Sequence, residues 1–381
     1  MDIEYRSSEH ASLGVEVELS IVDAQTRELA SAACEIIETL GLAHPDGEHP
    51  RVKHELFQCT LEMITGVCDT VAEARADLEA TLAETRSATE ARGLRLLCAG
   101  THPFSHWSDQ LVSPKPRYTE LVERIQWPAR RLAIYGIHYH VGVRSPEKAI
   151  AIANSLAAHL PVFLALSASS PYWHGLDSGM ASCRTKIFES LPTAGLPPPL
   201  RDWAEFESLM ETLVNADAVT SIREVWWDVR PHPDFGTVEL RMCDGMPTLT
   251  EVAAVAALAQ SLVHDLDLRL DRGEPLPGAR EWVVRQNKWV AARHGVDAEL
   301  IVDAAGTRRP ARELVEALVE RLTPSARYLG CADELDFVRS IAEHGPSYVR
   351  QRRVRAEGGS VIDVVDQLAD ELVTGSPTRG G

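Results

Sequence analysis

The chain has 381 residues, of which 45% are hydrophobic, and carries a formal net charge of −18 at pH 7. This composition supports a large buried core, but no stretch approaches the roughly 18 uninterrupted apolar residues of a membrane span, and the first ten residues lack an apolar signal segment. The acidic balance excludes binding to bare nucleic acid, which depends on lysine and arginine neutralising phosphates. We expect a cytoplasmic protein without nucleic-acid or membrane partners, and a homo-oligomer, most simply a dimer, by base rate.

No internal repeat and no linker divides the chain. We therefore predict a single domain over residues 1–374 and a disordered tail, GSPTRGG, over residues 375–381. The seven cysteines are scattered and odd in number, which indicates neither a disulfide framework nor a thiolate metal site. We expect them to be reduced and buried.

The most informative stretch is LGVEVELSIVD at residues 13–23. Apolar residues alternate there with a polar set that includes Glu16 and Glu18, which is the period of a half-buried strand, so both carboxylates point the same way. At roughly 7 Å they repel each other by about 2.5 kcal/mol if the effective dielectric constant is about 20. An isolated pair of this kind is usually an exposed acidic face. The alternative is a cavity wall where a divalent cation offsets the repulsion.

Two later segments repeat the pattern of one apolar and one ionisable face. Residues 134–144, IYGIHYHVGVR, place His138 on the ionisable face together with a second histidine. Residues 236–244, GTVELRMCD, place Glu239 and Arg241 there. We expect the latter segment to follow a strand at residues 221–230 through a turn at PHPDFG.

A further acidic segment, HELFQCTLEMIT at residues 54–65, contains Glu55 and Glu62. Their seven-residue spacing fits one face of a helix, whereas residues 60–64 also fit a strand with Glu62 facing the first acid pair. Periodicity alone leaves both interpretations open.

Most of the remaining chain has a helical pattern. Helices are expected at residues 31–40, 71–93, 145–167, 248–270, 311–322, 334–344 and 362–373. A buried strand is expected at residues 95–99. The Pro-rich segments 100–121 and 178–200 are expected to be ordered loops over a site, because long ordered loops in compact domains are usually functional.

Each ionisable residue has an ordinary explanation when taken alone: a core histidine, a cross-strand ion pair, a surface acid. Three two-faced strands together indicate an antiparallel sheet that packs helices on one face and gathers the charges on the other. Burying so many charges costs several kcal/mol unless cations and an anionic ligand complete the site. Carboxylates with an imidazole fit two or more Mg²⁺ ions on nucleotide phosphates, with arginine stabilising the transferred phosphoryl group.

The sequence lacks the other common motifs for phosphate binding and nucleophilic catalysis. It has no GxxxxGK[ST] loop, no protein-kinase motif set, no usable GxGxxG and no GxSxG. A cysteine or serine triad stays open, but no residue is singled out as the nucleophile. Metal-assisted phosphoryl chemistry is the better prediction.

These motifs resemble those of the carboxylate–amine ligases, also called type 2 glutamate–cysteine ligases, of the glutamine synthetase-like superfamily. The similar segments are GVEVEL (14–19), ELFQCTLEMITGVC (55–68), GTHPF (100–104), YGIHYHVGV (135–143), SLPTAGLPP (190–198), WWDVRPHPDFGTVELRMCD (226–244) and NKWVAARHG (287–295). The resemblance implies an α+β, glutamine synthetase-like fold, in which an antiparallel sheet forms a partial barrel, or funnel, flanked by helices. It also implies that ATP enters one end of the funnel and the acid and amine substrates the other.

The resemblance implies two metal sites, for Mg²⁺ or Mn²⁺. The first ion is expected to be held by Glu18, Glu55 and Glu62. The second is expected to be held by Glu16, His138 and Glu239.

Five residues are implied to act on the substrates. Arg241 corresponds to an arginine that contacts the γ-phosphate of ATP and the acyl phosphate, so Arg241, Glu16 and Glu18 are the expected catalytic residues. Arg184 and Arg230 correspond to anchors for a substrate carboxylate.

The chain departs from the family at one position. Family members commonly read GVEEE, whereas Val17 stands here in place of the middle acid. Because the alternation points residue 17 to the core face, we expect the metal site to be intact.

The implied reaction is ATP-dependent amide formation, in which phosphoryl transfer to a carboxylate gives an acyl phosphate that an amine attacks. Glutamate and cysteine, which give a γ-glutamyl product, are the family's usual substrates, but the sequence does not name the pair. Two alternatives stay open: a phosphagen-kinase-like phosphotransferase, and a catalytically silent homologue that binds nucleotide.

Overall fold

A seven-stranded antiparallel sheet forms the centre of the computed structural model, which describes residues 2–378. The strand order is β2-β3-β1-β5-β9-β8, and β4 pairs with the end of β1. The strands are β1 (Leu13–Asp23), β2 (Val52–His54), β3 (Thr60–Ile64), β4 (Leu94–Leu97), β5 (Gly136–Gly142), β8 (Val229–His232) and β9 (Thr237–Asp244). The predicted α+β class and the three two-faced strands are confirmed.

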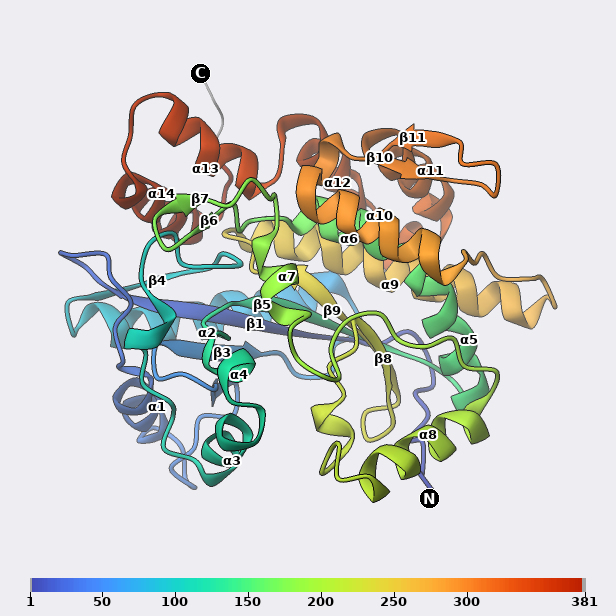
Figure 1. The fold of residues 1–381 in the computed structure, drawn as a ribbon, viewed down its shortest axis with the longest axis horizontal. Coiled ribbons are helices and arrows are strands. Elements are labelled where there is room, and N and C mark those ends of the chain that lie inside the picture. The colour runs from blue at the N-terminus through green and yellow to red at the C-terminus, as the bar shows by residue number, and fades with distance from the viewer. Residues whose placement is uncertain (1, 379–381) are drawn as a thin grey trace.

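Helices cover the apolar face of this sheet. Among them α2, α5, α6 and α9 contact its strands directly, and α9 to α12 lie together above the sheet in Figure 1. The helices are α1 (Ala33–Gly41), α2 (Val71–Glu90), α3 (Pro116–Ile125), α4 (Trp127–Arg130), α5 (Pro146–Ala157), α6 (Leu160–Ser167), α7 (Cys183–Phe188), α8 (Trp203–Asn215), α9 (Leu249–Asp271), α10 (Glu281–His294), α11 (Ala311–Leu329), α12 (Ala332–His344), α13 (Ser347–Ala356) and α14 (Val361–Thr374). Two small hairpins complete the fold: β6 (Tyr172–Trp173) with β7 (Leu176–Asp177), and β10 (Glu299–Ile301) with β11 (Arg308–Pro310).

The register of β1 is the one that its alternation predicts. Val17 lies between Met63 of β3 and Ile137 of β5, and all three side chains are buried in the core. The even-numbered acids Glu16 and Glu18 therefore face the opposite side of the sheet. The structure also settles the ambiguous acidic segment, because its residues 60–64 form strand β3.

Helix α9 is long and apolar enough to cross a membrane, but 83% of its most apolar window is buried inside the fold. It contacts α2, α11 and α12 as well as β1 and β5. We therefore describe it as the central core helix. The seven cysteines, all in the described part of the chain, are free thiols, as predicted. Six of them are buried, whereas Cys34 is only partly buried, contrary to the prediction.

The two predicted loops are partly helical. The segment 100–121 contains the start of α3, and the segment 178–200 contains α7. Four helices, α4, α8, α10 and α13, have no counterpart among the predicted elements.

The helix predicted at residues 145–167 and the strand predicted at residues 221–230 are each interrupted in the structure. The helix predicted over residues 145–167 is two helices, α5 and α6, whose axes differ by 62°. Pro161 stands in the first turn of α6, where it cannot donate a backbone hydrogen bond to a continuing helix. The strand predicted over residues 221–230 is a 3-10 turn at Ile222–Glu224 followed by the short β8.

The start of the C-terminal tail is packed on the domain. Thr250 Oγ1 donates to the Gly375 carbonyl oxygen at 2.8 Å, and the Thr378 amide donates to Glu371 Oε1 at 2.9 Å. Our prediction of disorder for residues 379–381 lies outside the described residues.

Candidate active site

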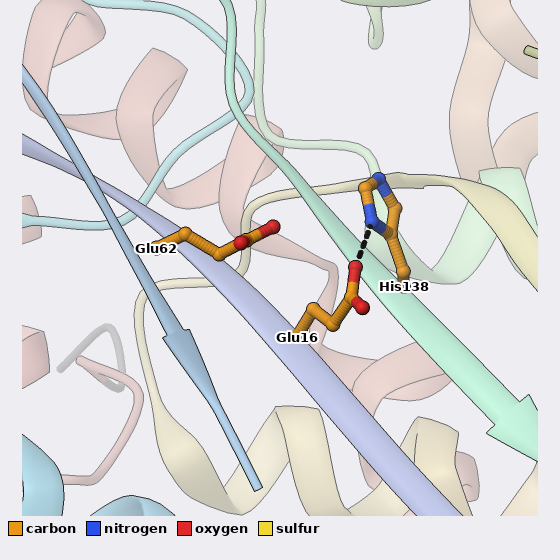
Figure 2. A group of neighbouring side chains, drawn as sticks. All are labelled: Glu16, Glu62 and His138. Atoms are coloured by element: carbon orange, nitrogen blue, oxygen red, sulfur yellow. Dashed lines mark hydrogen bonds and ion pairs between the residues drawn. The ribbon is translucent and has the colours of Figure 1, made fainter. Parts of the chain in front are cut away.

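The ionisable face of the sheet gathers acids and histidines from neighbouring strands. Glu16 of β1 stands opposite His138 of β5, and Glu18 stands opposite Glu62 of β3. Figure 2 shows Glu16, Glu62 and His138 converging from three strands, with a hydrogen bond between His138 Nδ1 and Glu16 Oε2 of 2.7 Å. Ligand atoms of these three residues lie within 4.8 Å of one another. The strands thus bring a ligand set together from distant parts of the chain.

Three carboxylates form the first predicted metal group. Oxygen atoms of Glu18, Glu55 and Glu62 lie within 4.8 Å of one another. Burial, together with the neighbouring Glu55, raises the pKa of Glu18 to about 7. Burial and the three neighbouring acids raise the pKa of Glu62 well above its usual range. A hard divalent cation bound here would offset both effects, so the donor set fits Mg²⁺ or Mn²⁺.

The second group contains a histidine that the sequence analysis did not single out as a ligand. His140 Nε2 lies 3.2 Å from Glu16 Oε1 and 3.7 Å from Glu239 Oε1. This buried nitrogen has no hydrogen-bond partner among the described residues, while Nδ1 lies 3.2 Å from Thr237 Oγ1. An imidazole nitrogen that faces two carboxylates at ion-pair distance, without a well-aligned hydrogen bond, fits a metal ligand. The structure groups Glu16 and Glu239 with His140, and Glu16 and His138 with Glu62.

Glu239 is the most enclosed acid of the site, with 1% of its surface exposed. Its carboxylate accepts a hydrogen bond from Arg230 Nε at 2.5 Å and one from Arg241 Nη1. Although burial disfavours the charge, Arg230 and Arg241 hold the pKa of Glu239 well below its usual range. Arg230 also donates to the carbonyl oxygens of Ile222 and Val225, so its contacts are largely internal.

Arg184 reaches the site from α7. Its guanidinium is buried, its Nη1 lies 3.8 Å from Asp244 Oδ1, and its Nε has no hydrogen-bond partner among the described residues. Gly136 allows this placement, because a β-carbon there would lie 2.0 Å from Arg184 Nη2. The amide of Gly136 also donates to Glu18 Oε2. The spare donor leaves Arg184 able to bind an anion.

Most of these residues line a cavity of about 480 Å³, but His140 and Glu239 are not among its lining residues. Its walls add side chains that sequence reasoning missed: Arg117, Tyr118, Arg223, Trp226, His232 and Phe235. Arg117 and Tyr118 belong to α3, and the signal that could have revealed this helix is Pro116 at its first position. Nothing in the sequence pattern ties this helix to the acids of the sheet.

A larger cavity of about 1040 Å³ lies elsewhere, beside α9, α12 and α13. Its buried Arg350 forms ion pairs with both Glu251 and Glu371. Since Arg350 already pairs with both acids, and none of the clusters of possible metal ligands among the described residues lies at this cavity, we place the chemistry in the smaller one.

The model of the glutamate-cysteine ligase family 2 matches residues 12–367. The chain belongs to this family. It is therefore a ligase of the carboxylate–amine type, as the resemblance predicts.

Relatives in this family match the chain from end to end. A protein of Frankia casuarinae, named as a candidate glutamate–cysteine ligase 2-1, is 53% identical over 382 residues, which cover 100% of both chains. A protein of Thermobifida fusca, named as a candidate glutamate–cysteine ligase 2, is 49% identical and covers 100% of this chain and 95% of its own.

Solved structures share the fold at low identity. The glutamate–cysteine ligase of Francisella tularensis in complex with AMP superposes with a TM-score of 0.71 at 13% identity, covering 97% of this chain and 90% of its own. A bifunctional glutathione synthetase of Pasteurella multocida gives a TM-score of 0.66 at 15% identity, covering 96% of this chain and 52% of its own. The predicted glutamine synthetase-like fold is confirmed.

In this member of the glutamate-cysteine ligase family, the cavity is lined by eight of the nine predicted site residues. They are Glu16, Glu18, Glu55, Glu62, His138, Arg184, Arg230 and Arg241. The ninth, Glu239, lies behind the wall and contacts two of its arginines. The sheet, helix α7 and the segment between β2 and β3 thus bring the whole predicted set together, and the individual roles stay predictions.

Proposed function

We propose that this protein is an ATP- and Mg²⁺-dependent ligase that forms an amide through an acyl phosphate. The observation that carries the proposal is the pair of carboxylate groups on one sheet face, with Arg241 beside them. The three-carboxylate group and the Glu16–His140–Glu239 group share this face, so two metal ions could sit on the same phosphate chain.

The residues of the chain have separable tasks in this proposal. When bound, Mg²⁺ would neutralise charge on the phosphates of ATP. Arg241, fixed by its ion pair with Glu239, directs guanidinium N–H groups toward the transferring phosphoryl group and the acyl phosphate. Arg184 supplies donors for a substrate carboxylate. Leu121, Leu132 and Ile134 form an apolar part of the wall that helps exclude water from the acyl phosphate.

Glutamate and cysteine are the first substrate pair to test, because the relatives from Frankia and Thermobifida carry glutamate–cysteine ligase names. Arg117 and Arg184 line the same cavity, which provides cationic side chains for two amino-acid carboxylates. The proposal therefore takes two amino acids as the acid and amine substrates. Small-molecule partners, a homodimer and a cytoplasmic location complete it, and sedimentation velocity tests the dimer.

A phosphate-release screen tests the proposal. The protein is incubated with ATP, Mg²⁺ and a matrix of amino acids and amines, and active pairs are examined by mass spectrometry. A product equal in mass to the two substrates less one water supports a ligase. A phosphorylated amine without an amide supports the phosphotransferase alternative. Nucleotide binding without phosphate release under any pair supports the silent homologue.

A further inference from the structure

The turn that joins β8 to β9 presents two aromatic rings at one end of the cavity. The rings of His232 and Phe235 are stacked, with centroids 4.2 Å apart and planes inclined by 6°. Both side chains line the cavity. Phe235 is nevertheless 58% exposed, so one face of the stack is available to a planar ligand.

Backbone contacts hold this turn in place. The Arg6 amide donates to the Pro233 carbonyl oxygen at 3.0 Å, and Ser8 Oγ donates to the Gly236 carbonyl oxygen at 3.0 Å. Gly236 has φ +62°, and a β-carbon there would lie 1.6 Å from the Arg6 carbonyl oxygen. The exposed ring therefore belongs to a preformed wall, which lowers the entropic cost of binding a ligand.

His232 also provides hydrogen-bonding nitrogen atoms in its ring. It is 6% exposed, and its Nδ1 has no hydrogen-bond partner among the described residues. An imidazole ring can offer one ring N–H donor and one acceptor nitrogen to a ligand. The stacked rings of His232 and Phe235 therefore suit a planar ligand that has a π-face and hydrogen-bonding groups at its edge.

The stacked rings adjoin the second metal group. The ring centroid of Phe235 lies 5.5 Å from that of His140, whose Nε2 faces Glu16 and Glu239. From Thr237 at the start of β9 to Arg241 the strand advances four residues, about 13 Å at 3.3 Å per residue. From the turn before β9 along that strand, the ring of Phe235, the metal ligand Glu239 with its cross-strand partner His140, and Arg241 follow one another. This is the order of base, phosphates and γ-phosphate in a nucleoside triphosphate.

We propose that Phe235 and His232 form the platform on which the purine base of ATP stacks. This inference rests on the proposed function and adds the direction in which the nucleotide lies. The base occupies the end of the cavity at the β8–β9 turn, and the acid and amine occupy the end at Arg117 and Arg184. Every nucleobase has a π-face that an exposed aromatic ring can bind.

The test compares two probes that differ only in the nucleoside. Equilibrium Kd values are measured by calorimetry for MgATP and for magnesium tripolyphosphate, which has the phosphates without the base. Phe235→Ala should raise the Kd for MgATP about tenfold or more, the usual loss for a base–aromatic stack. The Kd for magnesium tripolyphosphate should be unchanged. Phe235→Trp should restore MgATP binding, because it restores an aromatic face.

Trp282→Ala is the matched control, since Trp282 is 55% exposed on α10 and does not line the cavity. It should leave both Kd values unchanged. Equal MgATP affinity in Phe235→Ala and the wild type would overturn the base-stacking proposal but not the proposed ligase function. An equal loss for both probes would also overturn it, because the effect would then not depend on the base. Failure of the wild-type protein to bind MgATP at all would overturn the proposed function itself.

Discussion

Glu18 of β1 and Glu62 of β3 stand directly opposite each other in the antiparallel ladder, with both carboxylates in the cavity. Like charges at opposed positions destabilise a sheet. Burial and neighbouring carboxylates also raise the pKa values of Glu18 and Glu62, so both carboxyls bind protons more readily than exposed acids do. A bound cation would offset this repulsion between the two carboxylates. Because these acids hold protons that a cation would displace, proton release on metal binding tests the metal site.

Binding of Mg²⁺ should release protons near neutral pH. The pKa of Glu18 is about 7, so a substantial fraction of this carboxyl is protonated in the metal-free protein, whereas metal ligation requires the ionised form. Calorimetry at pH 7 in two buffers of different ionisation enthalpy should therefore give different apparent binding enthalpies. The apparent Mg²⁺ affinity should fall as the pH falls below 7.

The Glu18 carboxyl should also make the free energy of unfolding depend on pH. Its folded-state pKa of about 7 lies above the unfolded value of 4.5, so its contribution to the free energy of unfolding is fully present below pH 4.5 and is lost as the pH rises through 7. Saturating Mg²⁺ should remove this loss in urea unfolding. Glu62→Gln is the control and should reduce both the proton release and the effect of Mg²⁺. Identical binding enthalpies in the two buffers would count against a carboxylate metal site.

Val17→Glu should damage stability rather than the metal site. Val17 is 1% exposed between Met63 and Ile137, so a carboxylate there has no charged partner in the core. We expect the free energy of unfolding to fall by about 3 kcal/mol or more. The Kd for Mg²⁺, measured on the folded protein, should change little. Normal stability with a strongly altered Mg²⁺ affinity would show that residue 17 faces the cavity.

Gly136→Ala should weaken binding of the acid substrate. The added β-carbon would lie 2.0 Å from Arg184 Nη2, so the guanidinium must move, while the backbone hydrogen bond from residue 136 to Glu18 can persist. We expect the KM for the acid to rise about tenfold, the usual scale for losing a charged hydrogen bond, with little change in the KM for ATP.

Gly14→Ala is the matched control for this substitution. Gly14 lies on the same face of the neighbouring strand, and its added β-carbon would meet the nearest atom, His140 Cβ, at 3.5 Å, an ordinary contact. This variant should keep the wild-type KM values. An unchanged KM for the acid in Gly136→Ala would remove Arg184 from the substrate site.

The alternating strands were predictable because their side-chain period is set by the backbone itself. β1, β5 and β9 each carry this period over a run of residues, so the paired acids, His138 and Arg241 could be placed on one face. His140 also lies on that face, but its part in the second group depends on its pairing with Glu239 across β5 and β9. A cross-strand pairing of this kind is fixed by register, which a single strand does not reveal.

Other elements depend on tertiary contacts that no local pattern encodes. The stretch before β8 has strand-like composition, yet Arg230 donates to the carbonyl oxygens of Ile222 and Val225 and so supports a turn there. In α3 only Tyr118 is buried, and its hydroxyl donates to the His54 carbonyl oxygen at 2.7 Å. This contact with the last residue of β2 helps place Arg117 in the cavity. Such placements follow from the assembled fold.

The central claim is that a carboxylate oxygen of the acid substrate attacks the γ-phosphate of ATP, and one isotope experiment tests it directly. Acid labelled with oxygen-18 in the reacting carboxylate is turned over with ATP, Mg²⁺ and the amine identified by the screen. An acyl phosphate leaves one labelled oxygen in the inorganic phosphate released, and Glu16→Gln and Arg241→Ala should abolish this release while the protein stays folded. Unlabelled phosphate, or a phosphorylated amine in place of the amide, would contradict the account.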